Sequence, residues 1–386
     1  MFLTADPKDI LDGKITDVYF ERALEILKAK GVNPVVKAEF IAKALPKHWP
    51  WAILTGVGEA LELSKQLKVK VRAMREGSLF YPYEPVMEIE GRYQDFCVYE
   101  TALLGLICQA SGVSTQAARM KKLAGERLVM SFGARRMHPI LAPMIERNAY
   151  VGGCDGVAVV KSGELIGADP MGTMPHSLVL CMGSTLAAIK AYDEVLDPRL
   201  RRVALIDTFQ DEKFEVLNVA QALGTRLAAV RFDTPGSRRG DLFRILEETR
   251  WELELRGLGH VHFFVSGGIT EDDIPKLNPV AHGYGIGTSI SNAPVVDFAM
   301  DIVEVDGNPL AKRGKWSGSK RVLVCPQCGA RRIVPNSGAG VNACTCGNAF
   351  NDVLVPVLDN SRELVAQDPP LRIREFVLRT IKDRDL

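Results

Sequence analysis

The sequence has almost no excess of charge of either sign. Its 48 lysines and arginines stand against 47 aspartates and glutamates, which gives a formal net charge of +1. A chain so balanced lacks the basic surface with which proteins bind nucleic acid or an acidic membrane. We therefore expect neither nucleic acid nor membrane among its partners.

Two kinds of apolar segment are also missing. The N-terminal residues contain no basic region followed by an apolar core. No apolar run approaches the ~20 residues that span a bilayer. We therefore expect no secretory signal and no membrane span. Internal repeats and low-complexity segments are absent too, and the composition is that of an ordinary soluble protein. A cytoplasmic enzyme is the leading class.

Cysteine is scarce, and half of it is clustered. Four of the eight cysteines are scattered in apolar surroundings and are interpreted as small buried hydrophobes. These are Cys97, Cys108, Cys154 and Cys181. The clustered four are Cys325, Cys328, Cys344 and Cys346.

The clustered cysteines have the spacing of two metal-binding knuckles. A Cys-x-x-Cys and a Cys-x-Cys are separated by fifteen residues, a length that suits a small ribbon over residues 322–350. Four thiolates leave no open coordination position, so we predict a structural metal, zinc before other ions. A disulfide interpretation fits a cytoplasmic protein poorly. Arg331 and Arg332 make a thin basic patch, and binding of nucleic acid through the ribbon is the weaker alternative.

The length of 386 residues favours two or three domains. We expect an N-terminal α/β domain over residues 1–114, completed by C-terminal segments, and a catalytic α/β domain over 115–295. Residues 296–386 would form a C-terminal region that carries the ribbon. Apolar spacing predicts a helix over 14–30 that ends at Gly31, and a buried helix over about 99–110.

Short apolar strands alternate with helical stretches between residues 115 and 295. The expected strands are 127–132, 156–160, 203–206, 227–231, 261–265 and 283–286. Helices are expected between several of them, for example over 214–223 and 241–255. This alternation indicates a parallel sheet covered on both faces, either an α/β barrel or a doubly wound sheet.

Glycine and polar residues follow five of these strands, at 133–136, 207–211, 232–234, 266–268 and 287–289. The carboxyl ends of barrel strands are where such enzymes place their active sites. Ser266-Gly267-Gly268 and Gly285-Ile-Gly287-Thr288 are spaced like phosphate-binding turns. The alternative is that these glycines serve only tight turns.

Charged residues at the same strand ends suggest ligands of particular kinds. Arg135 and Arg136 suit a carboxylate or a phosphate. Asp207 and Asp233 could hold ribose hydroxyls or Mg²⁺, and Arg231 a second anionic group; each aspartate could instead cap a turn. His176 follows Pro175 in a short polar turn, where a histidine serves in packing, in metal binding or in proton transfer.

The segments at these positions resemble those of nicotinate phosphoribosyltransferases, in particular archaeal-type members with a C-terminal cysteine knuckle. The matching segments, in chain order, are Thr16-Asp-Val-Tyr19, Ser131-Phe-Gly-Ala-Arg-Arg136, Gly152-Gly-Cys-Asp155, Gly172-Thr-Met-Pro-His176, Ala204-Leu-Ile-Asp-Thr208, Val230-Arg-Phe-Asp233, Ser266-Gly-Gly268, Gly285-Ile-Gly-Thr288 and Ala311-Lys-Arg-Gly-Lys315. Together they cover most of the chain.

The resemblance implies a reaction and a fold. Nicotinate would displace pyrophosphate from phosphoribosyl pyrophosphate (PRPP), with ATP hydrolysis through a phosphohistidine, as a step of NAD biosynthesis. The fold would be that of type II phosphoribosyltransferases: an N-terminal α/β domain, an irregular α/β barrel and a small zinc-ribbon-like domain. A homodimer or larger assembly would share its active sites between subunits. Nicotinamide and quinolinate phosphoribosyltransferases are the nearest alternatives.

The resemblance also assigns roles to residues. His176 would accept the phosphoryl group, with Asp207 and Asp233 beside it as catalytic residues that hold ribose and Mg²⁺-pyrophosphate. The residues expected to bind substrate are Tyr19 from the partner subunit, Arg135, Arg136, His138, Asp155 beside the pyridine, Thr173, Thr208 and Arg231. The 5′-phosphate would lie on Ser266, Gly267, Gly268, Gly285, Gly287 and Thr288.

Two other classes of function remain open at this stage. A sugar-phosphate aldolase or isomerase would share the phosphate-binding turns but would have no use for Arg135 and His176 together. A zinc-ribbon binding or scaffold protein would need a basic face.

Overall fold

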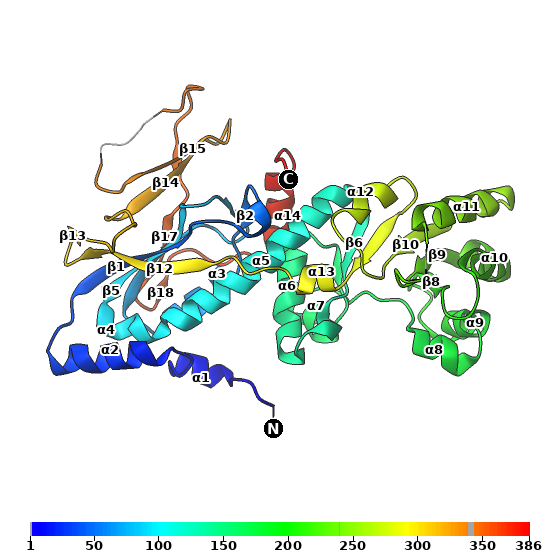
Figure 1. Cartoon of the computed structure of the whole chain (residues 1–386), viewed down its shortest axis with the longest axis horizontal. Coiled ribbons are helices and arrows are strands. Elements are labelled where there is room, and N and C mark those ends of the chain that lie inside the picture. The colour runs from blue at the N-terminus through cyan, green and yellow to red at the C-terminus, as the bar shows by residue number, and fades with distance from the viewer. Residues whose placement is uncertain (1, 239, 339–342) are drawn as a thin grey trace. The chain divides into compact units, whose positions relative to one another are not determined.

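The computed structural model describes residues 2–238, 240–338 and 343–386 (Figure 1). The chain divides into two compact units. The first unit combines residues 1–115 with residues 294–386, and the second unit spans residues 116–293.

The first unit is organised around a seven-stranded antiparallel sheet. Its strands, in spatial order, are β13 (Asn308–Pro309), β12 (Phe298–Val305), β1 (Val35–Ala42), β5 (Pro85–Arg92), β3 (Val69–Ala73), β17 (Val355–Asp359) and β18 (Arg362–Glu363). Strand β1 pairs with β12 on one side and with β5 on the other. Segments from both ends of the chain therefore complete one sheet.

Helices and a short two-stranded sheet accompany this sheet. They are α1 (Pro7–Leu11), α2 (Val18–Ala29), α3 (Val57–Ser64), α4 (Tyr93–Phe96), α14 (Pro370–Ile381) and the strand pair β2 (Ala52–Ile53) with β4 (Leu79–Phe80). The predicted helix over 14–30 corresponds to α2, and Gly31 follows it with a φ of 65°. One continuous apolar core, which includes Phe40, Ile89 and Leu103, joins the sheet to its helices.

Helix α5 (Glu100–Ala124) is longer than the sequence pattern suggested and runs from the first unit into the second. Together with the turns before it, it is the single helix among the described residues that is long and apolar enough to cross a membrane by length and composition. Its Leu103, Ile107 and Val113 are fully buried against the protein. The apolar side chains of α5 are therefore explained by packing in the protein core.

The C-terminal ribbon of the first unit is a three-stranded sheet. Strand β14 (Lys320–Val324) pairs antiparallel with β15 (Arg331–Pro335) and with β16 (Asn351–Asp352). Cys325 directly follows β14, and the other three clustered cysteines lie in the turns between these strands.

The second unit contains the six predicted parallel strands. They are β6 (Leu128–Ser131), β7 (Gly156–Val157), β8 (Arg202–Leu205), β9 (Leu227–Phe232), β10 (His262–Val265) and β11 (Gly283–Ile286). The spatial order is β7-β6-β11-β10-β9-β8, and β7 and β8 are the two edges. The sheet is thus a curled parallel half-barrel, which confirms the predicted fold class.

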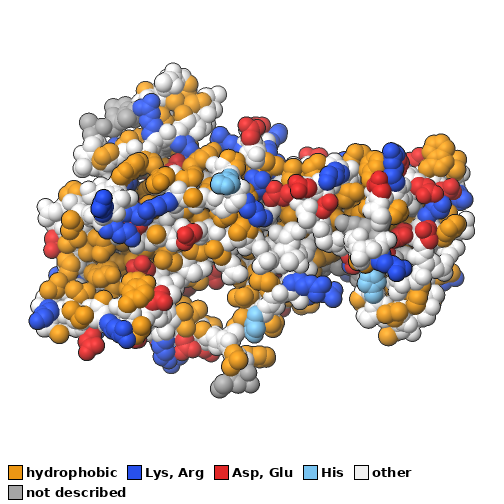
Figure 2. Space-filling model, viewed as in Figure 1, with side chains coloured by type: hydrophobic (Ala, Val, Ile, Leu, Met, Phe, Trp, Pro, Cys, Tyr) orange, Lys and Arg blue, Asp and Glu red, His pale blue; other side chains and the backbone are white. Residues whose placement is uncertain are grey.

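Helices lie between these strands along the chain. They are α6 (Ala142–Gly152), α7 (Val160–Ile166), α8 (His176–Met182), α9 (Thr185–Val195), α10 (Glu212–Leu223), α11 (Leu242–Leu255), α12 (Asp273–Leu277) and α13 (Thr288–Ser291). Strand residues such as Val230, Phe263 and Tyr284 are completely buried, as expected for strands in a covered parallel sheet. Figure 2 shows lysine, arginine, aspartate and glutamate side chains interspersed over the visible surface, in keeping with the balanced charge.

Candidate active site

A cavity of about 580 Å³ lies at the carboxyl ends of the parallel strands. Its lining includes Phe132 and residues 134–136 after β6, and residues 172–177 before and at the start of α8. Arg231 on β9 and Asp233 just after it also line the cavity. The turns after β10 and β11 close it with Ser266–Gly268 and Gly287–Ser289. Parallel strands end at one edge of a sheet, so their turns converge there, as the sequence pattern predicted.

His176 is the first residue of α8 and enters this cavity between three oxygen-bearing side chains. Its Nδ1 lies 3.1 Å from the hydroxyl oxygen of Thr208. Its Nε2 lies 3.5 Å from a carboxylate oxygen of Asp233 and 3.8 Å from one of Asp207. The side chain is 41% exposed. The imidazole is therefore oriented by neighbours and still accessible to a substrate.

Asp207 is the most buried of these groups, with a side chain that is 3% exposed. Burial raises the pKa of its carboxyl group, and the negative charge of Asp233 adds to that effect, whereas His176 and Arg231 oppose it. One of its oxygens, Oδ1, is buried without a hydrogen-bond partner among the described residues. Such an orphaned oxygen beside a strand-end cavity is suited to a cation.

Arg231 connects three turns of the cavity. Its guanidinium donates to the hydroxyl oxygens of Ser266 and Thr173, each at 3.0 Å, and to Asp233 at 2.8 Å. Ser266 in turn donates to the other carboxylate oxygen of Asp233 at 2.7 Å. These contacts fix the carboxylate of Asp233 in front of His176.

Glycine is required at these strand ends for two different structural reasons. Gly267 and Gly268 have φ values of 86° and 78°, and a Cβ on Gly267 would lie 2.9 Å from the carbonyl oxygen of Asp233. Only glycine fits such a turn without strain. Gly285 instead makes room for the ring of Phe132, which a Cβ would approach to 2.5 Å. Its place on the cavity wall is thus explained by packing.

Arg135 and Arg136 form a short helical turn at residues 134–136, and both are exposed and line the cavity. Neither forms an ion pair within the described part of the chain. Two unpaired guanidinium groups at the rim give this end of the cavity a positive charge for an anionic ligand.

Four residues expected to bind substrate do not line the cavity: Tyr19, His138, Asp155 and Thr208. Thr208 and the expected catalytic residue Asp207 lie just behind the lining, near His176. The carboxylate of Asp155 accepts from the Lys121 ammonium at 2.9 Å and from the Val129 amide at 2.8 Å. The Nδ1 of His138 accepts from the amide of Ile140 and caps the short turn that follows. Tyr19, on α2, belongs to the first unit and is 59% exposed.

The sequence assigned no substrate-binding role to several cavity residues. They are Phe132, Glu146, Ala158, Val159, Met174, Pro175, Ser177 and Ser289. The side chain of Glu146 is fully buried, which a single glutamate in a helical pattern does not reveal. Ser289 follows Thr288 in the predicted turn and donates to the carbonyl of Ile269 at 2.6 Å.

The four clustered cysteines converge as predicted. All four Sγ atoms lie within 4.8 Å of one another, and the Cys325–Cys346 and Cys328–Cys344 Sγ distances are 3.5 and 3.4 Å. Thiolates around a tetrahedral zinc, at about 2.3 Å from the ion, would be about 3.8 Å apart. The side-chain amide of Asn348 donates to Cys346 and lowers the pKa of that thiol to about 6. The cluster is consistent with a structural metal such as zinc.

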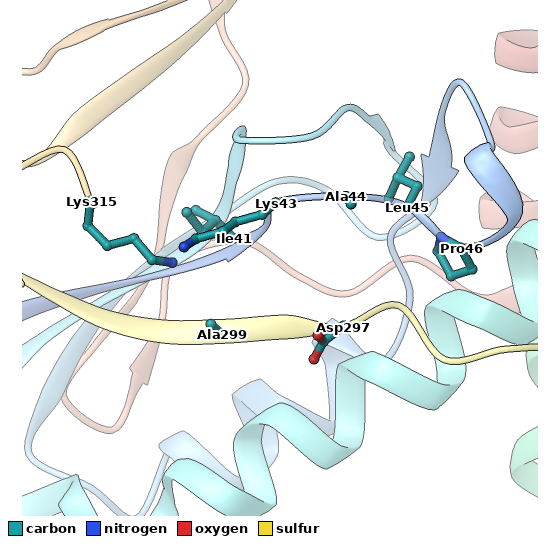
Figure 3. Close-up of a pocket in the computed structure, with 8 residues that line it drawn as sticks. All are labelled: Ile41, Lys43, Ala44, Leu45, Pro46, Asp297, Ala299 and Lys315. Carbon is teal, nitrogen blue, oxygen red and sulfur yellow. The ribbon is translucent and has the colours of Figure 1, made fainter. Parts of the chain in front are cut away.

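A second, smaller cavity of about 340 Å³ lies in the first unit (Figure 3). In Figure 3 the amino groups of Lys43 and Lys315 point toward one another, and Asp297 lies on the opposite wall. Lys315 also pairs with the buried carboxylate of Asp301. The sequence pattern had included Lys315 in a matched segment without assigning it a role.

Comparison with known proteins identifies the family. A crystal structure of nicotinate-nucleotide pyrophosphorylase from Pyrococcus furiosus is 46% identical, with a TM-score of 0.97 over 100% of this chain and 99% of that one. The chain belongs to the type II phosphoribosyltransferases of pyridine nucleotide biosynthesis.

Family models support this placement within the phosphoribosyltransferases. The model for the quinolinate phosphoribosyl transferase N-terminal domain matches residues 17–111, and that for its C-terminal domain matches residues 113–301. A nicotinate phosphoribosyltransferase of Mycobacterium tuberculosis is 28% identical over 348 residues, covering 80% of this chain and 76% of its own. The structure of human nicotinic acid phosphoribosyltransferase, 20% identical with a TM-score of 0.79 over 95% and 93% of the two chains, shows the shared fold.

Proposed function

We propose that this phosphoribosyltransferase transfers the phosphoribosyl group of PRPP to nicotinate and releases pyrophosphate. The observation that carries the proposal is the placement of His176, between Thr208 and two carboxylates, in a strand-end cavity whose rim holds two unpaired arginines. The curated relatives named as nicotinate phosphoribosyltransferases support the same choice of base.

The cavity divides into parts that suit the parts of the substrates. Arg135 and Arg136 can pair with the carboxylate of nicotinate, and Phe132 provides an apolar face for a ring. The positive-φ turn at Gly267–Gly268 and the amides at Gly287–Thr288 suit the 5′-phosphate. Arg231 and Asp233 at the end of β9, with Asp207 after the neighbouring strand β8, would hold ribose and pyrophosphate.

A Mg²⁺ ion fits the residues at this point. The partnerless Oδ1 of Asp207 and the carboxylate of Asp233 are the oxygen ligands that Mg²⁺ prefers. Such an ion would neutralise negative charge on pyrophosphate as it leaves. The chain's own contribution is to hold these two carboxylates in place through Arg231 and Ser266.

We further propose that His176 accepts a phosphoryl group from ATP. A neutral imidazole nitrogen attacks the terminal phosphorus, the bond to the bridging oxygen breaks, and ADP leaves with that oxygen. The contact with Thr208 holds the ring in one orientation for this step. A phosphorylated His176 beside Asp207 and Asp233 would couple the energy of ATP to PRPP binding.

The proposed assembly is a homodimer, or a larger assembly, with shared active sites in the cytoplasm. Tyr19, an exposed tyrosine on α2, would be supplied by the partner subunit to stack on the pyridine ring.

The second candidate is a quinolinate-type reaction. It is favoured by the family models, which describe quinolinate phosphoribosyl transferase domains. Two unpaired arginines could also bind the two carboxylates of that base.

Release of pyrophosphate by the purified protein distinguishes these proposals. The protein would be given PRPP and Mg²⁺ with nicotinate, nicotinamide or quinolinate, each with and without ATP. We expect release with nicotinate that ATP increases. Release with quinolinate but not with the other two bases would establish the second candidate. No release with any of the three bases would refute both candidates.

A further inference from the structure

Glu146 is a completely buried carboxylate on the wall of the active-site cavity. It lies on α6, and its two oxygens accept from two successive backbone amides. The Ala158 amide donates at 3.2 Å and the Val159 amide at 2.9 Å. Burial raises the pKa of this carboxyl group, and the Val159 amide, the Ser162 side chain and the Ala158 amide partly offset the effect. A buried carboxylate is costly unless it is hydrogen-bonded, so the two hydrogen bonds from the amides account for its presence.

The two amides belong to a turn that cannot satisfy them itself. Ala158 and Val159 connect β7 to α7, and Val159 occupies the N-cap position of α7. A valine side chain has no acceptor, so the N-cap residue makes no capping hydrogen bond of its own. Amides at a helix start need such an acceptor. Glu146 supplies it from the neighbouring helix.

This turn adjoins the strand end that carries the two arginines. Strand β7 pairs in parallel with β6 in the register Ser131 to Val157. The residues that follow, Phe132 on one strand and Ala158 on the other, therefore leave the sheet side by side. Both line the cavity, together with Arg135 and Arg136. Helix α6 itself begins shortly after these arginines, so Glu146 links the two turns.

We propose that Glu146 is a positioning residue for the pyridine base: its carboxylate fixes the Ala158–Val159 turn as the wall that faces the segment of Arg135 and Arg136. The inference rests on the proposed function, because it assigns this end of the cavity to the base. Glu146 does not touch the substrate, since it has no accessible surface. It acts through the backbone, and its loss would loosen the base site and leave the phosphate-binding turns after β10 and β11 intact.

The test uses Glu146→Gln in the full-length protein. Glutamine offers one acceptor oxygen in place of two, and its amide group would face a backbone N–H. The matched control is Glu215→Gln, because Glu215 is a buried glutamate of the same unit, on α10, that does not line the cavity. Hydrogen exchange of a peptide that contains residues 158 and 159 and the KM values for base and PRPP are measured for each variant.

We expect Glu146→Gln to raise the KM for the base roughly tenfold, in line with the loss of one hydrogen bond to a charged group. Exchange at residues 158–159 should accelerate by a similar factor, while the KM for PRPP changes less than about twofold. Glu215→Gln should show neither change. If Glu146→Gln does not fold, Glu146→Asp, whose shorter side chain cannot reach both amides, should show the same two changes.

Failure of this inference is distinct from failure of the proposed function. A wild-type protein that uses no pyridine base refutes the assignment of a base site, and with it the role of Glu146 toward a base. The inference about Glu146 alone is overturned if the wild type is active but Glu146→Gln has the wild-type KM for the base. It is overturned equally if hydrogen exchange at residues 158–159 is as slow in the variant as in the wild type.

Discussion

The hydroxyl of Thr208 lies 3.1 Å from Nδ1 of His176 and is its nearest polar neighbour among the described residues. The two side chains come from different segments, the start of α8 and the turn after β8. This contact leaves Nε2 directed at the carboxylates of Asp207 and Asp233. The orientation of the imidazole therefore depends on a threonine that is not itself a lining residue of the cavity.

The first prediction follows from this contact. Thr208→Val keeps the shape of the side chain and removes the hydroxyl, so the imidazole loses its fixed orientation. We expect the rate of labelling of the protein by γ-labelled ATP to fall roughly tenfold, the effect of one hydrogen bond. His176→Asn should not label at all. Labelling of His176→Asn at the wild-type level would refute the phosphohistidine assignment.

The second prediction concerns the three hydrogen bonds that the guanidinium of Arg231 donates. Arg231→Lys keeps the charge but cannot donate to Ser266, Thr173 and Asp233 together. We expect kcat/KM for PRPP to fall by about 100-fold or more, because the carboxylate facing His176 loses its support. Arg250→Lys, in a helix outside the cavity, serves as the control. Equal activity of the Arg231 variant and the wild type would contradict this role.

The third prediction separates a structural from a substrate-binding role for Asp155. Its carboxylate is engaged by Lys121 and by the amide of Val129. Asp155→Asn should therefore destabilise the protein by about 2–3 kcal/mol in urea unfolding and leave the KM for nicotinate unchanged. If the KM for nicotinate changes and the stability does not, Asp155 binds the base, as the resemblance implied.

The fourth prediction concerns the cysteine cluster. Purified protein not exposed to chelator should contain about one zinc per chain by elemental analysis, and Cys328→Ser should contain far less. The ion would contribute on the order of 10 kcal/mol to folding of the ribbon, so its removal should unfold that segment. Cys181→Ser, which changes a cysteine outside the cluster, should retain its zinc. Metal-free wild-type protein would show that the cluster needs no ion.

The fifth prediction is a pH dependence of stability at His282. Its Nδ1 accepts from the Phe263 amide, and its ring stacks on His262 with centroids 4.4 Å apart. Burial, His262 and Arg250 lower the pKa of His282 from 6.5 to about 4. The group therefore favours the folded state above pH 6.5, and that contribution is lost as the pH falls toward 4.

The measurement for His282 is the free energy of unfolding in urea between pH 7 and pH 4. The wild type should lose up to about 3 kcal/mol more over this range than His282→Asn, which offers an acceptor near the position of Nδ1 and does not titrate. Parallel curves for the two proteins would show that His282 does not account for the loss.

The local pattern of the sequence determined the strands and the cysteine cluster. Six apolar runs bounded by glycine or charge became six parallel strands within one or two residues, except that β7 is shorter than expected. The reason is that buried parallel strands and their terminal turns have distinctive local compositions. Two closely spaced cysteine pairs likewise have few arrangements other than a shared ion.

Tertiary structure decided which polar side chains reach the cavity. Asp155 stands at the amino end of β7, away from the edge where the active-site turns converge, and Lys121 from α5 binds it there. Glu146 looks like an exposed residue of an amphipathic helix until the turn after β7 is placed against it. The direction of a polar side chain depends on partners distant in sequence, and only the packed half-barrel brings those partners within hydrogen-bonding distance.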